Sequence, residues 1–257
     1  MKLFSNWPDD RRGAPKTVIR SAIFGVVRRG RRQRVVDMPV ASPARTTITI
    51  TGWRLDQHDC DVWLEVMHLA RNTAPGSEVR FTIHSMLKRL NLPTTGSNHY
   101  ESLGRRLKNL METTISYETP DSIGGAGSLI ASFHIDKSTG EAVVTTNPKT
   151  RSLWETVSWI DVEQRRSLGA NQLAKAMHAM LAAVADWSPM RLDTLMQRVG
   201  AEYGRIRDFK LPLESVLEDF KARGWIRSYA IGKGDSGLVT IDKVPTPSQA
   251  RALEART

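Results

Sequence analysis

Two stretches of the chain combine positively charged side chains with a regular apolar pattern, which suits binding to an anionic polymer. In residues 98–111 apolar side chains recur every three or four positions, a spacing that predicts an amphipathic helix. Its other face carries hydrogen-bond donors for phosphates or base edges, namely Asn98, His99, Ser102, Arg105, Arg106 and Lys108. A second such helix, expected from residue 205 onward, carries Arg205, Arg207 and Lys210 near its start. A cationic helix of this kind can lie in the major groove of DNA.

Each cationic helix is expected to follow a shorter helix and to precede a β-hairpin. The first short helix should stop at Asn91, and an Asn98–Glu101 pair should cap the longer one. In the second copy, Ser188 should be the N-cap and Pro189 the first helical residue. Helix, turn, helix and hairpin make the winged-helix plan, so the predicted fold class is α+β with two tandem winged-helix domains.

Glycine-rich segments are expected at the tips of the two hairpins, at residues 124–127 and 232–237. The first tip carries neither lysine nor arginine, so it fits a plain turn as well as a wing that probes a groove. The second tip contains Lys233, which favours contact with a phosphate. The cations of the long helices have an alternative explanation too, as an ordinary solvated surface.

The charge of the chain is concentrated at its N-terminus. Lysine and arginine number 37 against 27 acidic residues, and residues 1–34 hold ten of the cations against Asp9 and Asp10. This excess favours nucleic acid as the partner. We expect a basic N-terminal arm and helix over residues 1–36, then winged-helix domains over residues 37–155 and 156–257. The arm should contact phosphates through Arg28, Arg29, Arg31 and Arg32.

Between the N-terminal arm and the first cationic helix, the sequence predicts a strand and a supporting helix. Residues 18–26 carry an apolar run expected to form a short helix that ends near Gly30. The alternating segment 46–53 predicts a strand, with Pro39 and Pro43 in the loop before it. A helix should follow with Asp56 as its N-cap.

Three segments resemble the TrfA family of plasmid replication initiators: WPDDRRGAPKTVIRSAIFGVVRRGRR, LDQHDCDVWLEVMHLAR and FTIHSMLKRL. The later segment EYGRIRDFKLPLESVLEDF is similar to the C-terminal reading helix of the iteron-binding initiators that include RepE and the π protein. The resemblance implies binding to double-stranded iteron repeats at an origin, opening of adjacent DNA and contact with single-stranded origin DNA. It also implies recruitment of a host helicase, initiator and sliding clamp, with an active monomer in equilibrium with a dimer. Leu3 and Phe4 are candidates for the clamp contact.

Several other classes of function are disfavoured. A single cysteine, Cys60, allows neither an intramolecular disulfide nor a cysteine-based zinc cluster, which favours the cytoplasm. The absence of a long apolar run argues against a membrane partner, and the segment 22–27 is too short for a signal sequence. His58, Asp59 and Asp61 point in different directions on a helix, so we expect no metal site and no cofactor.

We also expect no enzymatic activity. A helicase or ATPase would need a phosphate-cradling GxxxxGK[ST] motif, and the nearest stretch, residues 25–32, does not match it. A dimeric winged-helix transcriptional repressor remains the alternative within DNA binding. A DNA-processing enzyme, such as a nuclease or relaxase, is the less favoured alternative.

Overall fold

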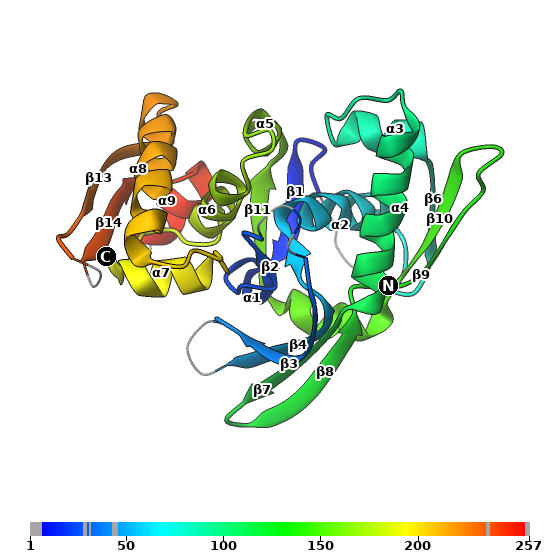
Figure 1. Cartoon of the computed structure of the whole chain (residues 1–257), viewed down its shortest axis with the longest axis horizontal. Helices are drawn as coiled ribbons and strands as arrows, with labels where there is room; N and C mark the ends of the chain where they lie inside the picture. Colours follow the sequence, from blue (N-terminus) through cyan, green and yellow to red (C-terminus); the bar gives the residue numbers. More distant parts are fainter. Residues whose placement is uncertain (1–6, 28–29, 31, 43–45, 235–236, 255–257) are drawn as a thin grey trace.

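The computed structural model describes residues 7–27, 30, 32–42, 46–234 and 237–254, and it is a mixed α/β protein. Two groups of elements lie side by side, with α4 on one side and α8 on the other (Figure 1). Within the described residues, no helix is long and apolar enough to cross a membrane. The same part of the chain holds no cluster of three histidine, cysteine or acidic side chains that could bind a metal ion.

The first group contains the expected pair of helices, α3 (Ile83–Arg89) and α4 (Ser97–Glu112). The Thr82 hydroxyl caps α3 by accepting from the Ser85 backbone N–H at 3.1 Å. Asn91, with a φ of 55°, turns the chain after α3, and Gly96 takes the N-cap position of α4. The predicted Asn98–Glu101 cap is therefore wrong, because Asn98 already lies inside the first turn of α4.

The hairpin that accompanies this helix pair is not the predicted one. It is formed by β9 and β10, which join β6 in an antiparallel sheet; the bounds are β6 (Glu78–Thr82), β9 (Ile130–Ile135) and β10 (Glu141–Thr146). The glycines 124–127 lie within a different strand, β8 (Ser122–Ser128), rather than at a tip. A Cβ on Gly124 would come within 2.7 Å of the Tyr117 ring, so glycine serves close strand packing there.

Strand β8 belongs to a four-stranded antiparallel sheet of order β3-β4-β7-β8. The other strands are β3 (Arg34–Val40), β4 (Thr47–Trp53) and β7 (Thr114–Thr119). The prediction of strand β4 is confirmed. Pro39, expected in a loop, lies in β3 instead, and Pro43 is outside the described residues.

The second group repeats the arrangement of helices and hairpin. It contains α6 (Gln172–Ala182), α7 (Leu192–Arg198), α8 (Ile206–Ala222) and the sheet β12-β14-β13, with β12 (Met190–Arg191), β13 (Ile226–Ile231) and β14 (Leu238–Lys243). Helix α9 (Pro247–Glu254) follows. The predicted hairpin is confirmed. The predicted start of α7 at Pro189 is wrong, because Met190 and Arg191 pair with β14 as a third strand.

Residues 7–27, the longest described stretch of the N-terminal segment, pack into the fold. Strand β1 (Arg11–Pro15) pairs antiparallel with β11 (Val157–Asp161), and β2 (Phe24–Gly25) pairs parallel with β5 (Leu55–Asp56). Between them, α1 (Lys16–Ile19) has four residues instead of the longer helix expected over 18–26. The apolar run serves two cores, since Val18 and Ile23 pack in the first and Val26 contacts the second.

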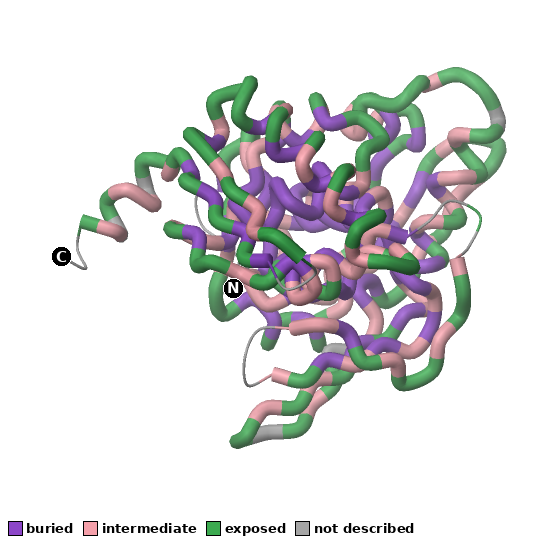
Figure 2. The backbone as a smooth tube through the Cα atoms, turned by 60° about the vertical axis from the view of Figure 1, so that its left-hand side comes forward, coloured by how far each residue is buried: buried purple, intermediate pink, exposed green. Residues whose placement is uncertain are grey.

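Helix α2 (Gln57–Leu69) supports the first group as expected and begins with Asp56 as its N-cap. The cap is reciprocal, because the Asp56 side chain accepts from the Asp59 N–H and Asp59 accepts from the Asp56 N–H. Buried residues form two clusters, one around Trp63 and one around Phe209 and Phe220. Figure 2 shows the buried backbone running through the centre, with exposed residues along the projecting hairpins.

Candidate nucleic-acid interface

Helix α4 presents only part of its predicted cationic set to solvent. Its buried stripe consists of Leu103, Leu107 and Leu110. Asn98, Arg105 and Lys108 lie on the exposed side, and Lys108 Nζ is 3.7 Å from Glu112 Oε1 on the same helix. Tyr100, an aromatic residue in the first turn of α4, is also exposed. The outward face of α4 therefore offers one arginine, one lysine and one amide.

The remaining predicted residues of α4 face inward. Arg106 Nη1 lies 3.2 Å from Asp56 Oδ1 and 3.3 Å from Asp59 Oδ1, at the start of α2. His99 and Ser102 line a cavity of about 350 Å³ between α2, α4 and α5 (Val162–Ser167). These three side chains belong to the packing between helices rather than to the exposed face.

Arg32 is drawn into the same cluster. Its guanidinium pairs with Asp56, and its Nη1 lies 2.9 Å from Asp59 Oδ2. Burial and the adjacent Asp56 carboxylate raise the pKa of Asp59 to about 6. Burial acts in the same direction on Asp56, but Arg106 and Arg32 outweigh it and lower the pKa of that carboxyl. Two arginines and two carboxylates thus neutralise each other inside the first group.

Helix α8 keeps its cations at the surface. Arg205 occupies the N-cap position and is exposed, while the Arg207 side chain is 69% exposed and lies 3.8 Å from Asp208. Lys210 Nζ is 3.8 Å from Glu214 Oε1. The opposite side of α8 is buried and consists of Phe209, Leu213, Val216, Leu217 and Phe220. The exposed start of α8 is therefore cationic.

The β9–β10 and β13–β14 hairpins each carry a lysine at the turn. Lys233 is exposed in the turn between β13 and β14, as predicted. Lys137 is exposed in the turn between β9 and β10, and the sequence prediction missed it because it placed the hairpin elsewhere. Its turn has a recognisable signal: the Asp136 carboxylate accepts from the Ser138 N–H at 2.8 Å, and Gly140 has a φ of 72°.

Five further predicted residues fall outside the part of the chain that the structure describes. Arg28, Arg29 and Arg31, together with Leu3 and Phe4, lie outside the described residues. Arg12, by contrast, is buried beside Glu65, with Nε 3.0 Å from Oε1 and Nη2 2.9 Å from Oε2. Part of the charge assigned to a free arm therefore neutralises a carboxylate of α2.

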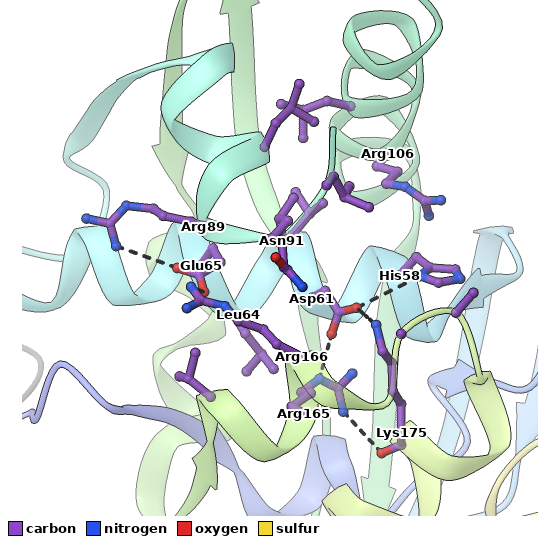
Figure 3. A pocket seen from close by; sticks show the side chains of 18 of the residues that line it. His58, Asp61, Leu64, Glu65, Arg89, Asn91, Arg106, Arg165, Arg166 and Lys175 are labelled. Carbon is purple, nitrogen blue, oxygen red and sulfur yellow. Dashed lines mark hydrogen bonds and ion pairs between the residues drawn. The ribbon is translucent and has the colours of Figure 1, made fainter. Parts of the chain in front are cut away.

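A second ionic cluster joins the two groups of elements. Asp61 on α2 accepts from Arg165 Nε at 2.5 Å and from Lys175 Nζ at 2.6 Å, on α5 and α6 respectively (Figure 3). Arg165 also donates to Gln57 Oε1 at 3.0 Å. Burial alone would raise the pKa of Asp61, but Arg165 and Lys175 outweigh it and lower this pKa. The cations of α5 and α6 thus hold the second group against α2.

Comparison with protein families gives a match over most of the chain. The family model described as TrfA protein matches residues 1–235. The curated plasmid replication initiator protein TrfA of Escherichia coli is 22% identical over 229 residues, which cover 86% of this chain and 59% of the relative. The chain therefore spans less than two thirds of the length of that relative.

Two solved structures share the fold. The Pi initiator protein in complex with iteron DNA has a TM-score of 0.57 at 11% identity and covers 74% of this chain and 94% of its own. Domains 2 and 3 of RctB have a TM-score of 0.57 at 12% identity and cover 88% of this chain and 96% of their own. At these identities the likeness concerns the fold.

Proposed function

Because the chain belongs to the TrfA family, we propose that it is a non-enzymatic plasmid replication initiator that binds iteron repeats at an origin. In this proposal residues 37–155 and 156–257 are tandem winged-helix domains, and residues 7–27 pack against both. One observation carries the proposal: two helix pairs, each with a hairpin, present an exposed cationic helix, α4 and α8. The Pi initiator, a protein of similar fold, was solved with iteron DNA.

The proposed contacts with DNA come from the exposed faces of the two helices. They are Asn98, Arg105 and Lys108 on α4, and Arg205, Arg207 and Lys210 at the start of α8. Lys137 and Lys233 at the hairpin turns are proposed to contact phosphates, together with Arg28, Arg29 and Arg31. Arg32, His99, Ser102 and Arg106 act by positioning α4, because they face other helices.

One monomer is proposed to read one asymmetric site. Two different reading helices in one chain need no twofold partner, and grooves on one side of DNA recur about every 10.5 base pairs. The binding unit is therefore a direct repeat of roughly 20 base pairs. After binding, the initiator opens adjacent DNA, contacts the exposed single strand, and recruits a host helicase, initiator and sliding clamp. A dimer in equilibrium with the monomer is the inactive form.

Footprinting on DNA that flanks the gene tests this function. The expected result is a series of directly repeated protected units, each roughly 20 base pairs long. With supercoiled DNA carrying these units and a divalent metal ion, strand opening should occur without nicks. A palindromic footprint would favour the dimeric repressor, and nicked DNA would favour a nuclease or relaxase.

The contact with the sliding clamp has a separate test. Leu3 and Phe4 are adjacent apolar side chains of the kind that fits a preformed hydrophobic pocket. In a pull-down with purified clamp, the Leu3→Ala, Phe4→Ala double variant should lose most of the retained clamp. Equal retention by wild type and variant would remove these residues from the proposal without affecting DNA binding.

A further inference from the structure

The cavity between α2, α4 and α5 carries more positive charge than its carboxylates neutralise. Its lining includes six arginine or lysine residues but two acidic residues, Asp61 and Glu65. Arg165 and Lys175 share Asp61, while Arg106 is neutralised by carboxylates outside the lining. The uncompensated charge is therefore concentrated around Glu65.

Three guanidinium groups converge on the single Glu65 carboxylate. Arg12 occupies both of its oxygens at hydrogen-bond distance. Arg89 Nη1 is 3.7 Å from Oε2, and Arg166 Nη2 is 3.6 Å from Oε1, so these two lie beyond normal hydrogen-bond length (Figure 3). With one negative charge among three positive ones, Arg89 and Arg166 are available to a second anion.

Arg166 also has an unsatisfied hydrogen-bond donor. Its Nε is buried and has no hydrogen-bond partner within the described part of the chain. A buried donor without an acceptor is unfavourable, and a phosphate oxygen is a strong acceptor for a guanidinium. The side chains of Arg89 and Arg166 are 39% and 34% exposed, so an incoming anion can reach the outer nitrogens of both, and it reaches the Arg166 Nε only if that guanidinium turns toward the cavity.

The rest of the cavity provides an apolar wall. Its residues come from all sides of the space: Leu64, Leu87, Leu90, Leu92, Leu103 and Val162. The volume of about 350 Å³ lies within the range of small-molecule sites. A ligand that fits this lining carries a compact anion at one end and an apolar or aromatic group at the other.

We propose that this cavity binds a small phosphate monoester, with its phosphate between Arg89 and Arg166 and its organic group against the leucines. A free molecule fits better than a phosphate of the DNA backbone, because the two guanidiniums line a concavity rather than the outward face of α4. Arg89 ends α3 and Arg166 lies on α5. The bound anion therefore ties the first helix pair to the second half of the chain.

Thermal unfolding of the full chain tests the site with AMP, inorganic phosphate and adenosine at constant ionic strength. A ligand that binds the native state raises the midpoint as its concentration rises. AMP should raise it most and inorganic phosphate less, whereas adenosine should leave it unchanged. Arg89→Gln and Arg166→Gln should each weaken the apparent affinity for AMP at least tenfold, while Arg80→Gln, an exposed arginine paired with Glu78, should retain it.

Thermal unfolding without ligand distinguishes anion binding by Arg89 and Arg166 from a structural role of the two arginines. If the two arginines serve the ligand, Arg89→Gln and Arg166→Gln leave the ligand-free midpoint unchanged or raise it by relieving repulsion. A large fall in that midpoint would make them structural partners of Glu65 and overturn the proposal. So would a wild type whose midpoint does not respond to AMP. Because the AMP measurements contain no DNA, their failure would leave the proposed iteron binding untouched.

Discussion

Helices α4 and α8 have similar patterns of cations and apolar residues, yet they expose their cations differently. On α4, Arg106 is held by two carboxylates, which leaves Arg105 and Lys108 facing outward. On α8, Arg205 and Arg207 are both exposed near the start of the helix. The same local pattern thus places the exposed cations along the middle of α4 but at the start of α8.

The difference originates in the supporting helices. Helix α2, behind α4, begins with Asp56 and carries Asp59 and Asp61 in its first two turns. Helix α6, beside α8 in Figure 1, has the sequence QLAKAMHAMLA, which contains neither aspartate nor glutamate. A carboxylate in the supporting helix draws an arginine inward, whereas an apolar support leaves the cations of the reading helix at the surface.

The largest expected effect concerns the neighbouring arginines of α4. Arg106→Ala leaves Asp56 and Asp59 with less compensating charge in a buried site, so the free energy of unfolding should fall by about 3–5 kcal/mol. Arg105→Ala, one position away but exposed, should change it by no more than about 0.5 kcal/mol. Urea denaturation followed by circular dichroism measures both. Equal stability of the two variants would mean that Arg106 is not part of the supporting network.

A second test compares base recognition by the two helices. Arg207→Ala should relax discrimination at one or two positions of the site by about 1–3 kcal/mol, because an arginine can pair bidentately with guanine. Arg105→Ala should act similarly in the other half of the site. Competition against a randomised DNA library locates the affected positions. Arg223→Ala, near the C-terminal end of α8 and paired with Asp219, is the matched control, and a uniform loss at all positions would contradict base reading by Arg207.

A third test concerns the response of the supporting helix α6 to acid. Burial, followed by the charges of Arg165 and Lys243, lowers the pKa of His178 on α6 to about 3. Histidine in the unfolded chain has a pKa of about 6.5, so between the two pKa values the unfolded chain binds more protons than the native protein. The free energy of unfolding should therefore fall by about 1.4 kcal/mol for each unit by which the pH decreases.

His178→Gln should reduce the dependence of the free energy of unfolding on pH, measured between about pH 6 and pH 4. Asp59 on α2 acts in the opposite direction, because its raised pKa makes the native state bind a proton first, and its contribution favours folding as the pH falls from about 6. An unchanged slope in the His178→Gln variant would show that the imidazole is not the acid-sensitive group of α6.

The smallest effect concerns phosphate contacts. Lys108→Ala on α4 and Lys210→Ala on α8 should weaken binding to specific and random DNA by similar factors, since phosphates carry no sequence information. Each lost contact should reduce the slope of log affinity against log salt by about 0.9. Titrations at several salt concentrations measure the slope. If the salt slope changed for only one of the two lysines, only the helix that carries this lysine would contact the DNA backbone.

The elements whose signal is local were predictable from the sequence. Apolar residues at a spacing of three and four identified α4 and α8, and Asp56 identified the start of α2. The hairpin after α8 was found for the same reason, since its two strands are adjacent in the chain. The region after α4 was not, because two successive hairpins, β7–β8 and β9–β10, stand where the sequence predicted one, and they belong to different sheets.

The sequence by itself determined that two amphipathic helices carry arginine and lysine opposite an apolar stripe. Tertiary structure alone decided which of those cations remain at the surface, because the carboxylates that neutralise Arg106 lie about 50 residues earlier, on α2. It also decided that residues 11–15 of the basic N-terminal segment are packed, since β1 finds its partner strand in β11. Charge and periodicity are local properties, whereas neutralisation and strand pairing depend on which distant segments meet.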